Sequence, residues 1–359
     1  MSAPEITTGT EDDERHVLAN QWTQRGIALL SSGHAETLPE ALKCFETAIE
    51  LRRSLPLEAQ PWYRWGLTAG WMNRGDALTR MGSLREALAS YEHALEHLML
   101  LPSTLDPAVS WRLGLAWMNR ALVLRELGPE HVDDAVRSVD KSIEVLSESQ
   151  AESPRHRGTL GCAWANRAAV LMEAPSPLAL QAQDAALRGR DLLRELEQQD
   201  SVAAEAGIKA RHCYCQATAW LLETPPVDAK AADQWIMTGT DCVEEGLALY
   251  LGWREHLSPA LGDLALQLFR FGCRIYLAYQ PQFLAEFMLD VLNPEKAGLG
   301  LDAAFYDAAD EASLTAARLL RQRGPAQLGT GRVEDVLHLL GQLSDATARL
   351  KEWRSTADR

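Results

Sequence analysis

Residues 71–95 read WMNRGDALTRMGSLREALASYEHAL and contain two amphipathic segments separated by a short break. Within each segment, apolar and small residues recur three or four positions apart, which is the spacing of one face of a helix. The break at Met81-Gly82-Ser83 holds a glycine, the residue that most often ends a helix. The segment therefore predicts a helical hairpin, with the second helix beginning at Leu84.

The first five residues of this segment have counterparts elsewhere in the chain. The related pentapeptides are Trp22-Thr23-Gln24-Arg25-Gly26, Trp71-Met72-Asn73-Arg74-Gly75, Trp117-Met118-Asn119-Arg120-Ala121 and Trp164-Ala165-Asn166-Arg167-Ala168. Their tryptophans are 49, 46 and 47 residues apart. A repeat of this length indicates hairpins that cannot bury their apolar faces alone and stack on their neighbours. The sequence thus predicts an all-α solenoid.

The second unit resembles the tetratricopeptide repeat, with Trp71, Gly75, Ala87, Tyr91 and Ala94 at that family's offsets. The other units keep part of the pattern: Trp22, Gly26, Ala41, Phe45 and Ala48; Trp117, Ala121, Gly128 and Ala135; and Trp164, Ala168, Ala182, Ala186 and Gly189. The resemblance implies a superhelix of antiparallel helix hairpins. Because the units exceed the family's 34 residues, we expect lengthened helices, similar to those of kinesin light chain.

The domain organisation follows from where the repeat can be traced. We expect a flexible acidic tail at 1–15, about five tetratricopeptide-like repeats at 16–253, and C-terminal helices at 254–359 that continue and cap the solenoid. The fifth repeat is placed 49 residues after the fourth, with Cys213, Cys215 and Ala217 at the positions of Trp164, Asn166 and Ala168. We expect one continuous solenoid rather than two domains.

The charge balance limits the classes of partner. With 50 acidic against 35 basic residues and a net charge of −15, the chain is unsuited to nucleic-acid binding, which relies on Lys and Arg at the phosphates. The sequence shows neither a signal peptide nor a run of 18 apolar residues, so we expect no membrane association and a cytoplasmic location. The six cysteines form no disulfide framework, which fits a reducing compartment.

A row of side-chain amides stands two positions after each repeat tryptophan: Gln24, Asn73, Asn119 and Asn166. The tetratricopeptide resemblance implies that this position faces a concave groove. An amide both donates and accepts hydrogen bonds, so a row of amides could hold the backbone of an extended peptide. The alternative is that these amides cap or bridge neighbouring helices.

The positions one and five after the tryptophans indicate what else would line such a groove. In carboxylate-clamp co-chaperones these positions are basic, whereas this chain carries Met72, Asp76, Met118 and Leu122 there, so binding of a terminal carboxylate is disfavoured. Together with Met172, the methionines and Leu122 suggest an adaptable apolar strip. The alternative is that the methionines belong to the core.

A row of arginines follows the amides directly: Arg25, Arg74, Arg120 and Arg167. We favour ion pairs with acids of the second helices, such as Glu46, Glu92 or Asp140, because an unpaired buried charge would be costly. The alternative is that the row binds a small anionic ligand.

No pattern indicates an enzyme, a metal or a cofactor. His93 and His97 are four residues apart but lack a Glu between them and a third ligand. Cys213 and Cys215 are too close for a zinc ribbon. Glu244 and Glu245 are interpreted as solvated helix surface.

The leading functional prediction is a non-enzymatic adaptor or scaffold that binds another protein or an extended peptide, of basic or apolar character. The alternative is a regulatory subunit or sensor that controls a partner enzyme. A copy of the chain itself is a further candidate partner through the C-terminal helices, where the apolar stretch 264–287 is either an interface or core.

Overall fold

The computed structural model describes residues 8–102, 105–106, 108–148, 153–174, 178–224, 228–258, 260–293, 301–322 and 333–357. The regular structure of these residues is entirely helical, which confirms the predicted all-α class. The contacts divide the chain into two units, Met1–Pro177 and Leu178–Arg359.

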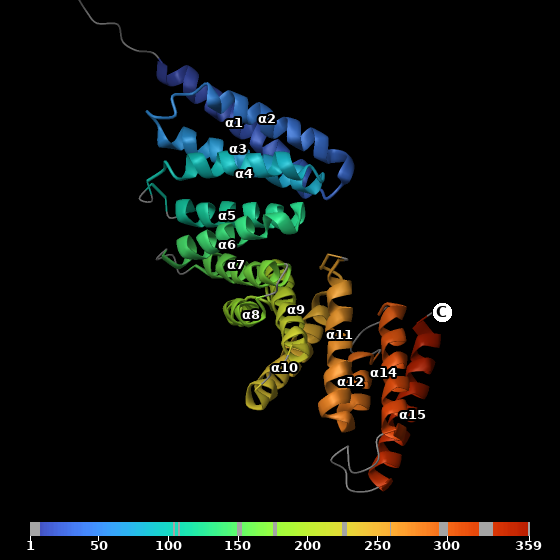
Figure 1. Ribbon diagram of the computed structural model, residues 1–359. Coiled ribbons are helices and arrows are strands. Elements are labelled where there is room, and N and C mark those ends of the chain that lie inside the picture. The colour runs from blue at the N-terminus through green and yellow to red at the C-terminus, as the bar shows by residue number, and fades with distance from the viewer. Residues whose placement is uncertain are drawn as a thin grey trace, which may run out of the picture. The chain divides into compact units, whose positions relative to one another are not determined.

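The first unit is a stack of helix hairpins, labelled α1 to α7 in Figure 1. Helix α1 packs on α2, α3 on α4 and α5 on α6, and each hairpin packs on the next through α2–α3, α4–α5 and α6–α7. This is the predicted tetratricopeptide-like arrangement of sequential hairpins. The bounds are α1 (Thr8–Ser31), η1 (Ala35–Thr37), α2 (Leu38–Arg53), α3 (Pro61–Arg80), α4 (Leu84–Leu98), α5 (Ala108–Leu127), η2 (Pro129–His131), α6 (Val132–Glu148) and α7 (Pro154–Met172).

Glycines set the turn of each of these hairpins. Gly33, Gly82 and Gly128 stand between the two helices of successive hairpins with φ of 74°, 75° and 129°. Side chains other than hydrogen are disfavoured at such φ values. These glycines therefore end the first helix of each hairpin, as the break at residues 81–83 predicts.

Within two hairpins, a glycine of the first helix receives an aromatic ring of the second. A Cβ added to Gly26 would lie 2.5 Å from the ring of Phe45, and one added to Gly75 would lie 2.7 Å from Tyr91. The third hairpin has the smaller Val139 in the core cluster that contains Ala121. Glycine at this position therefore allows the two helices to lie close together, because the aromatic ring occupies the space that a larger side chain would fill.

Two expected boundaries differ from the structure. Helix α1 begins at Thr8, so residues 8–15 are helical rather than a tail, and Tyr63 donates a hydrogen bond to Asp13 over 2.7 Å. The division between units falls at 177/178 rather than at 253/254. As a result, α7 and α8, predicted to form the fourth hairpin, belong to different units, and within the second unit α8 packs on α9.

The second unit joins α8 to α9, α9 to α10 and α10 to α11, and then α11 to α14 and α14 to α15. Its helices are α8 (Ala179–Leu193), α9 (Ser201–Glu223), α10 (Ala229–Trp253), α11 (Ala260–Tyr279), η3 (Pro281–Phe283), α12 (Leu284–Val291), α14 (Ala303–Gln322) and α15 (Val333–Ala357). Among these residues and those of the first unit, no helix has the length and apolar character to cross a membrane.

The apolar stretch at 264–287 lies mainly inside the second unit. Leu268 and Phe269 are fully buried, and the ring of Phe269 stacks on that of Phe287 at 5.5 Å between centroids. Tyr279 and Phe283 are half exposed. Most of the stretch is therefore core, and self-association through the C-terminal helices stays a prediction.

Candidate functional site

The amide row lies on the first helices of the successive hairpins. Gln24 on α1 is exposed, and Asn73 on α3, Asn119 on α5 and Asn166 on α7 are half-buried. The side-chain amides of Asn73 and Asn166 make no hydrogen bond to another residue that the structure describes. Asn119 is engaged, since its Nδ2 donates to Asp76 Oδ1 over 3.2 Å.

Asp76 connects three helices rather than facing a ligand. Its Oδ1 accepts from the hydroxyl of Tyr91 on α4 over 2.5 Å and from Asn119 on α5. Burial raises the pKa of Asp76 above its ordinary value, against the opposing effects of Tyr91 and Arg80. The expectation that Asp76 lines an open groove is therefore corrected, because its acceptor is already occupied between hairpins.

The expected apolar strip is also corrected. Met72, Met118 and Met172 are each 8% exposed or less. Met72 belongs to a core cluster with Leu95 and Leu98, and Met118 to one with Val139 and Ile143. Because neighbouring helices cover them, these methionines fill the spaces between hairpins, and only Leu122 is half-buried.

The arginine row is paired along its length with acids of the second helices. Arg74 pairs with Glu46 at 3.1 Å, Arg120 with Glu92 at 2.9 Å and Arg167 with Asp140 at 2.7 Å. Each of these pairs joins a first helix to the second helix of the preceding hairpin, and Arg25 pairs with Glu40 of its own hairpin. Glu46, Glu92 and Asp140 are the three acids that the sequence predicted as partners of the arginine row.

Each arginine also lies beside the tryptophan three residues before it. The guanidinium carbon is 5.6 to 6.0 Å from the ring centroid in the four pairs Arg25–Trp22, Arg74–Trp71, Arg120–Trp117 and Arg167–Trp164. Arg74 and Arg120 additionally donate to Ser90 and Ser138. Arg74, Arg120 and Arg167 thus join neighbouring hairpins, and their pairing with acids leaves less net positive charge for a small anion.

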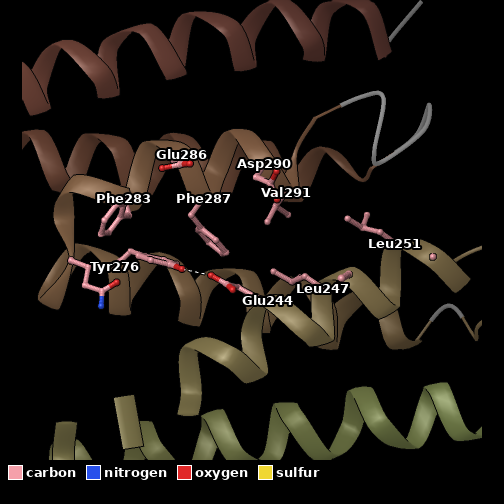
Figure 2. Close-up of a pocket in the computed structure, with 12 residues that line it drawn as sticks. Glu244, Leu247, Leu251, Tyr276, Phe283, Glu286, Phe287, Asp290 and Val291 are labelled. Atoms are coloured by element: carbon pink, nitrogen blue, oxygen red, sulfur yellow. Dashed lines mark hydrogen bonds between the residues drawn. The ribbon is translucent and has the colours of Figure 1, made fainter. Parts of the chain in front are cut away.

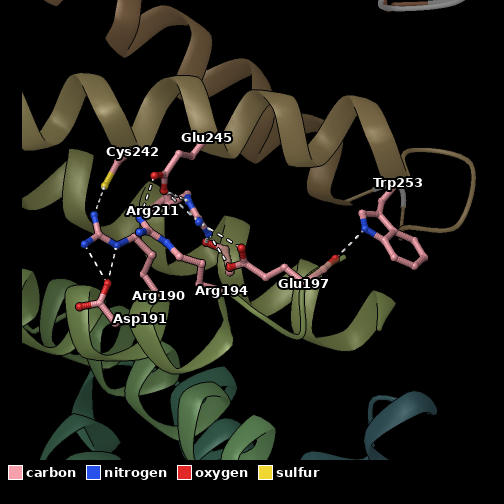
Figure 3. A network of polar contacts seen from close by, with 9 residues as sticks. Arg190, Asp191, Arg194, Glu197, Arg211, Cys242, Glu245 and Trp253 are labelled. Atoms are coloured by element: carbon pink, nitrogen blue, oxygen red, sulfur yellow. Dashed lines mark hydrogen bonds and ion pairs between the residues drawn. The ribbon is translucent and has the colours of Figure 1, made fainter. Parts of the chain in front are cut away.

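A polar network in the second unit has no counterpart in the sequence predictions (Figure 3). The Arg211 side chain is 3% exposed and bonds both oxygens of Glu197, at 2.6 and 3.1 Å. Its Nη2 also bonds Glu245 Oε2 at 3.0 Å, and Arg194 pairs with Glu245 Oε1 at 2.8 Å. Glu245 was predicted to be solvated surface, and it is instead the acid that joins α10 to α9.

Glu244, the neighbour of Glu245, lines a pocket of about 840 Å³ between α10, α11 and α12 (Figure 2). Its Oε1 accepts from the hydroxyl of Tyr276 over 2.5 Å. Sequence reasoning missed this pocket, because its residues come from three helices with no shared spacing.

The histidines make ordinary side-chain contacts. The rings of His93 and Trp71 lie 4.6 Å apart between centroids with their planes tilted by 36°. Nδ1 of His97 lies 3.4 Å from Arg64, and Nε2 of His212 lies 2.7 Å from Gln267. The described parts of the chain contain no group of three or more His, Cys, Asp or Glu residues that could hold a metal ion.

Comparisons with known proteins identify similar solved structures only. No protein-family model matches the chain, and no curated protein matches it. BtubC (BKLC) from P. vanneervenii has 14% identity and a TM-score of 0.47 over 80% of this chain and 94% of that chain. A tetratricopeptide repeat protein from Parabacteroides merdae ATCC 43184 has 15% identity and a TM-score of 0.33 over 91% and 98%. Rap protein complexed with competence and sporulation factor has 14% identity and a TM-score of 0.34 over 97% and 99%.

Proposed function

We propose that the first unit binds an extended segment of another protein through the amide row, so that the chain acts as an adaptor or scaffold. Stacked helix hairpins typically present extended binding surfaces. The observation that carries the proposal is that Asn73 and Asn166 recur at equivalent positions, are partly exposed and have side-chain amides that form no hydrogen bond to a described residue.

The chemistry of the row favours a polypeptide backbone over an ion. A side-chain amide offers a donor and an acceptor, which match the alternating C=O and N–H groups of an extended chain. The arginines next to the row are neutralised by Glu46, Glu92 and Asp140. The row therefore recognises the hydrogen-bonding geometry of the backbone rather than charge. Specificity for the partner's side chains comes from residues outside the row.

The test begins with a displayed library of random peptides selected on the full chain. The enriched peptide is then measured by fluorescence anisotropy against the wild type and against Asn73→Ala/Asn166→Ala. Two lost hydrogen bonds of about 0.5–1.5 kcal/mol each predict a loss of affinity of roughly 5- to 150-fold. Asn119 is left intact, because its bond to Asp76 connects hairpins.

A matched control is Thr47→Ala/Ser147→Ala, which removes neutral polar groups from the second helices α2 and α6. We expect this control to bind as tightly as the wild type. Peptides methylated at alternate backbone nitrogens should bind weakly if the amides hold the backbone. Equal affinity of both double variants, or indifference to backbone methylation, would contradict the proposal.

A further inference from the structure

The second unit contains an open pocket between α10, α11, η3 and α12. Its volume of about 840 Å³ lies within the range of roughly 300–1,000 Å³ that is typical of ligand sites. Helix α10 contributes one side, α11 the base, and η3 with α12 the opposite side. Figure 2 shows Glu244, Tyr276 and Phe287 directed toward the same space.

At the base of the pocket, Tyr276 donates its hydroxyl to Oε1 of Glu244. Burial, together with the hydrogen bond to Glu244, raises the pKa of Tyr276, so the phenol stays protonated and the carboxylate accepts. Oε2 of Glu244 makes no hydrogen bond to any residue the structure describes. One carboxylate oxygen, held in place by the phenol, therefore remains for a ligand.

The walls of the pocket are apolar and its remaining charges are negative. Leu247, Phe287 and Val291 are buried wall residues, and Glu286 and Asp290 of α12 are exposed at the rim. The described lining contains no Lys or Arg. This combination suits a cation on an apolar stem, because the stem packs on the walls while the charged head reaches the carboxylate.

A metal ion fits the arrangement poorly. The acids do not approach one another as a group of three that could hold a metal, among the residues the structure describes. Bare cations need several oxygen ligands at once. The lining therefore favours an organic cation over a metal ion.

Aromatic surface at the edge of the pocket indicates that the occupant extends outward. Phe283 of η3 lines the pocket and is 47% exposed, and Tyr279, the last residue of α11, is 51% exposed. A free small cation inside the pocket would leave these rings uncovered, whereas a polypeptide would cover them with the residues that flank its basic side chain.

We propose that this pocket is a second binding site, which takes a Lys or Arg side chain of a partner polypeptide. The methylene groups lie along Leu247, Phe287 and Val291, and the cationic head pairs with the free oxygen of Glu244. The acids at the rim attract the basic segment before contact. This site lies in the second unit and does not depend on the amide row.

The test measures fluorescein-labelled acetyl-Leu-Arg-Phe-Arg-Leu-amide against the full chain by fluorescence anisotropy. Its counterpart carries citrulline in place of both arginines, which keeps the shape and removes the charge. Loss of a charge-assisted hydrogen bond predicts that the citrulline peptide binds about tenfold more weakly or worse. Equal binding of the two peptides, or no binding of the arginine peptide, overturns the proposal.

Glu244→Gln is the decisive variant, because the glutamine oxygen can still accept from Tyr276 while the charge is lost. We expect it to bind the arginine peptide about tenfold more weakly. The control is Asp233→Asn, an equal charge change at an exposed position of the same helix α10, and it should bind like the wild type. Equal losses in both variants would show a general charge effect and refute the site.

Two further measurements distinguish lost binding from lost folding, and a polypeptide ligand from a free small cation. Glu286→Gln removes a rim charge at an exposed position and should weaken binding without any change in the melting temperature, whatever the effect of Glu244→Gln on folding. Agmatine, which has a guanidinium at one end of a butyl chain and an ammonium at the other, should compete only weakly. If agmatine displaces the peptide at equal concentration, the site serves free small cations and the polypeptide assignment fails.

Discussion

Replacing Arg211 by Met should strongly destabilise the second unit. Arg211 is buried between α9 and α10, and the carboxylate it bonds, Glu197, is only 4% exposed. The substitution would leave Glu197 buried with no cation, whereas Glu245 would keep Arg194 at 2.8 Å. Removing one partner of such a buried pair costs about 3–5 kcal/mol of the free energy of unfolding.

A second buried arginine provides the matched comparison. Arg52 is 1% exposed, but its partners Thr23 and Asn20 are neutral, at 3.0 and 2.6 Å. Burial lowers the pKa of Arg52 to about 10, which reflects a charge without a compensating carboxylate. Arg52→Met loses two hydrogen bonds of about 0.5–1.5 kcal/mol each and relieves that burial, so we expect a loss smaller by about 2 kcal/mol than for Arg211→Met.

Urea unfolding followed by far-UV circular dichroism would measure the global effect. Hydrogen exchange resolved by mass spectrometry would assign it to peptides of α9 and α10, because two units need not unfold in one transition. The double variant Arg211→Met/Glu197→Leu removes the stranded charge and should recover most of the stability. The reasoning fails if Arg211→Met costs no more than Arg52→Met, or if the double variant is no more stable than the single one.

Gly26→Ala and Asp76→Asn test the first unit, and Gly341→Ala in the second unit is the control for the glycine substitution. Gly26→Ala would place a methyl group 2.5 Å from Phe45 and should cost about 1–3 kcal/mol; Gly341→Ala, with nothing within 4 Å in α15, should be neutral or slightly stabilising in thermal melts. Burial raises the pKa of Asp76 in the folded chain above its unfolded value. The protonated carboxyl is therefore the form that the fold favours, and the free energy of unfolding falls as pH rises from the unfolded pKa toward the folded pKa. Asp76→Asn should remove this pH dependence. The melting temperatures of the variant and the wild type should then diverge as pH rises from 4 to 7, with the variant the more stable at pH 7. Parallel melting curves over this range would show that the pKa of Asp76 is not raised.

The repeated part of the chain was largely predictable because its contacts repeat with the sequence. The pairs Arg74–Glu46 and Arg120–Glu92 are both separated by 28 residues, so one register places both. The same periodicity assigned the methionines to a groove, which was wrong. Spacing tells which face a side chain occupies, but it does not tell whether the next hairpin covers that face, as one does for Met72.

The second unit was less predictable because its interactions do not repeat. Arg211 meets Glu197 and Glu245 across 14 and 34 residues, and none of the three residues belongs to the repeated pentapeptides. Glu244 and Glu245 are adjacent in the sequence, yet successive residues of a helix point about 100° apart. One therefore faces the pocket and the other the buried arginine, a distinction that polarity alone does not make.

The regularity of the amides is what the packing of the hairpins leaves unexplained. The repeated tryptophans lie against arginines, the arginines pair with acids of the second helices, and Gly26 and Gly75 receive aromatic rings. Each of these residue types recurs because the contact it makes recurs. Asn73 and Asn166 recur although their side-chain amides make no hydrogen bond to a described residue, and Ala would form the same helix at no cost in propensity. Their repetition is therefore best explained by a partner outside the chain, which is why a loss of binding without a loss of stability is the result that distinguishes this proposal.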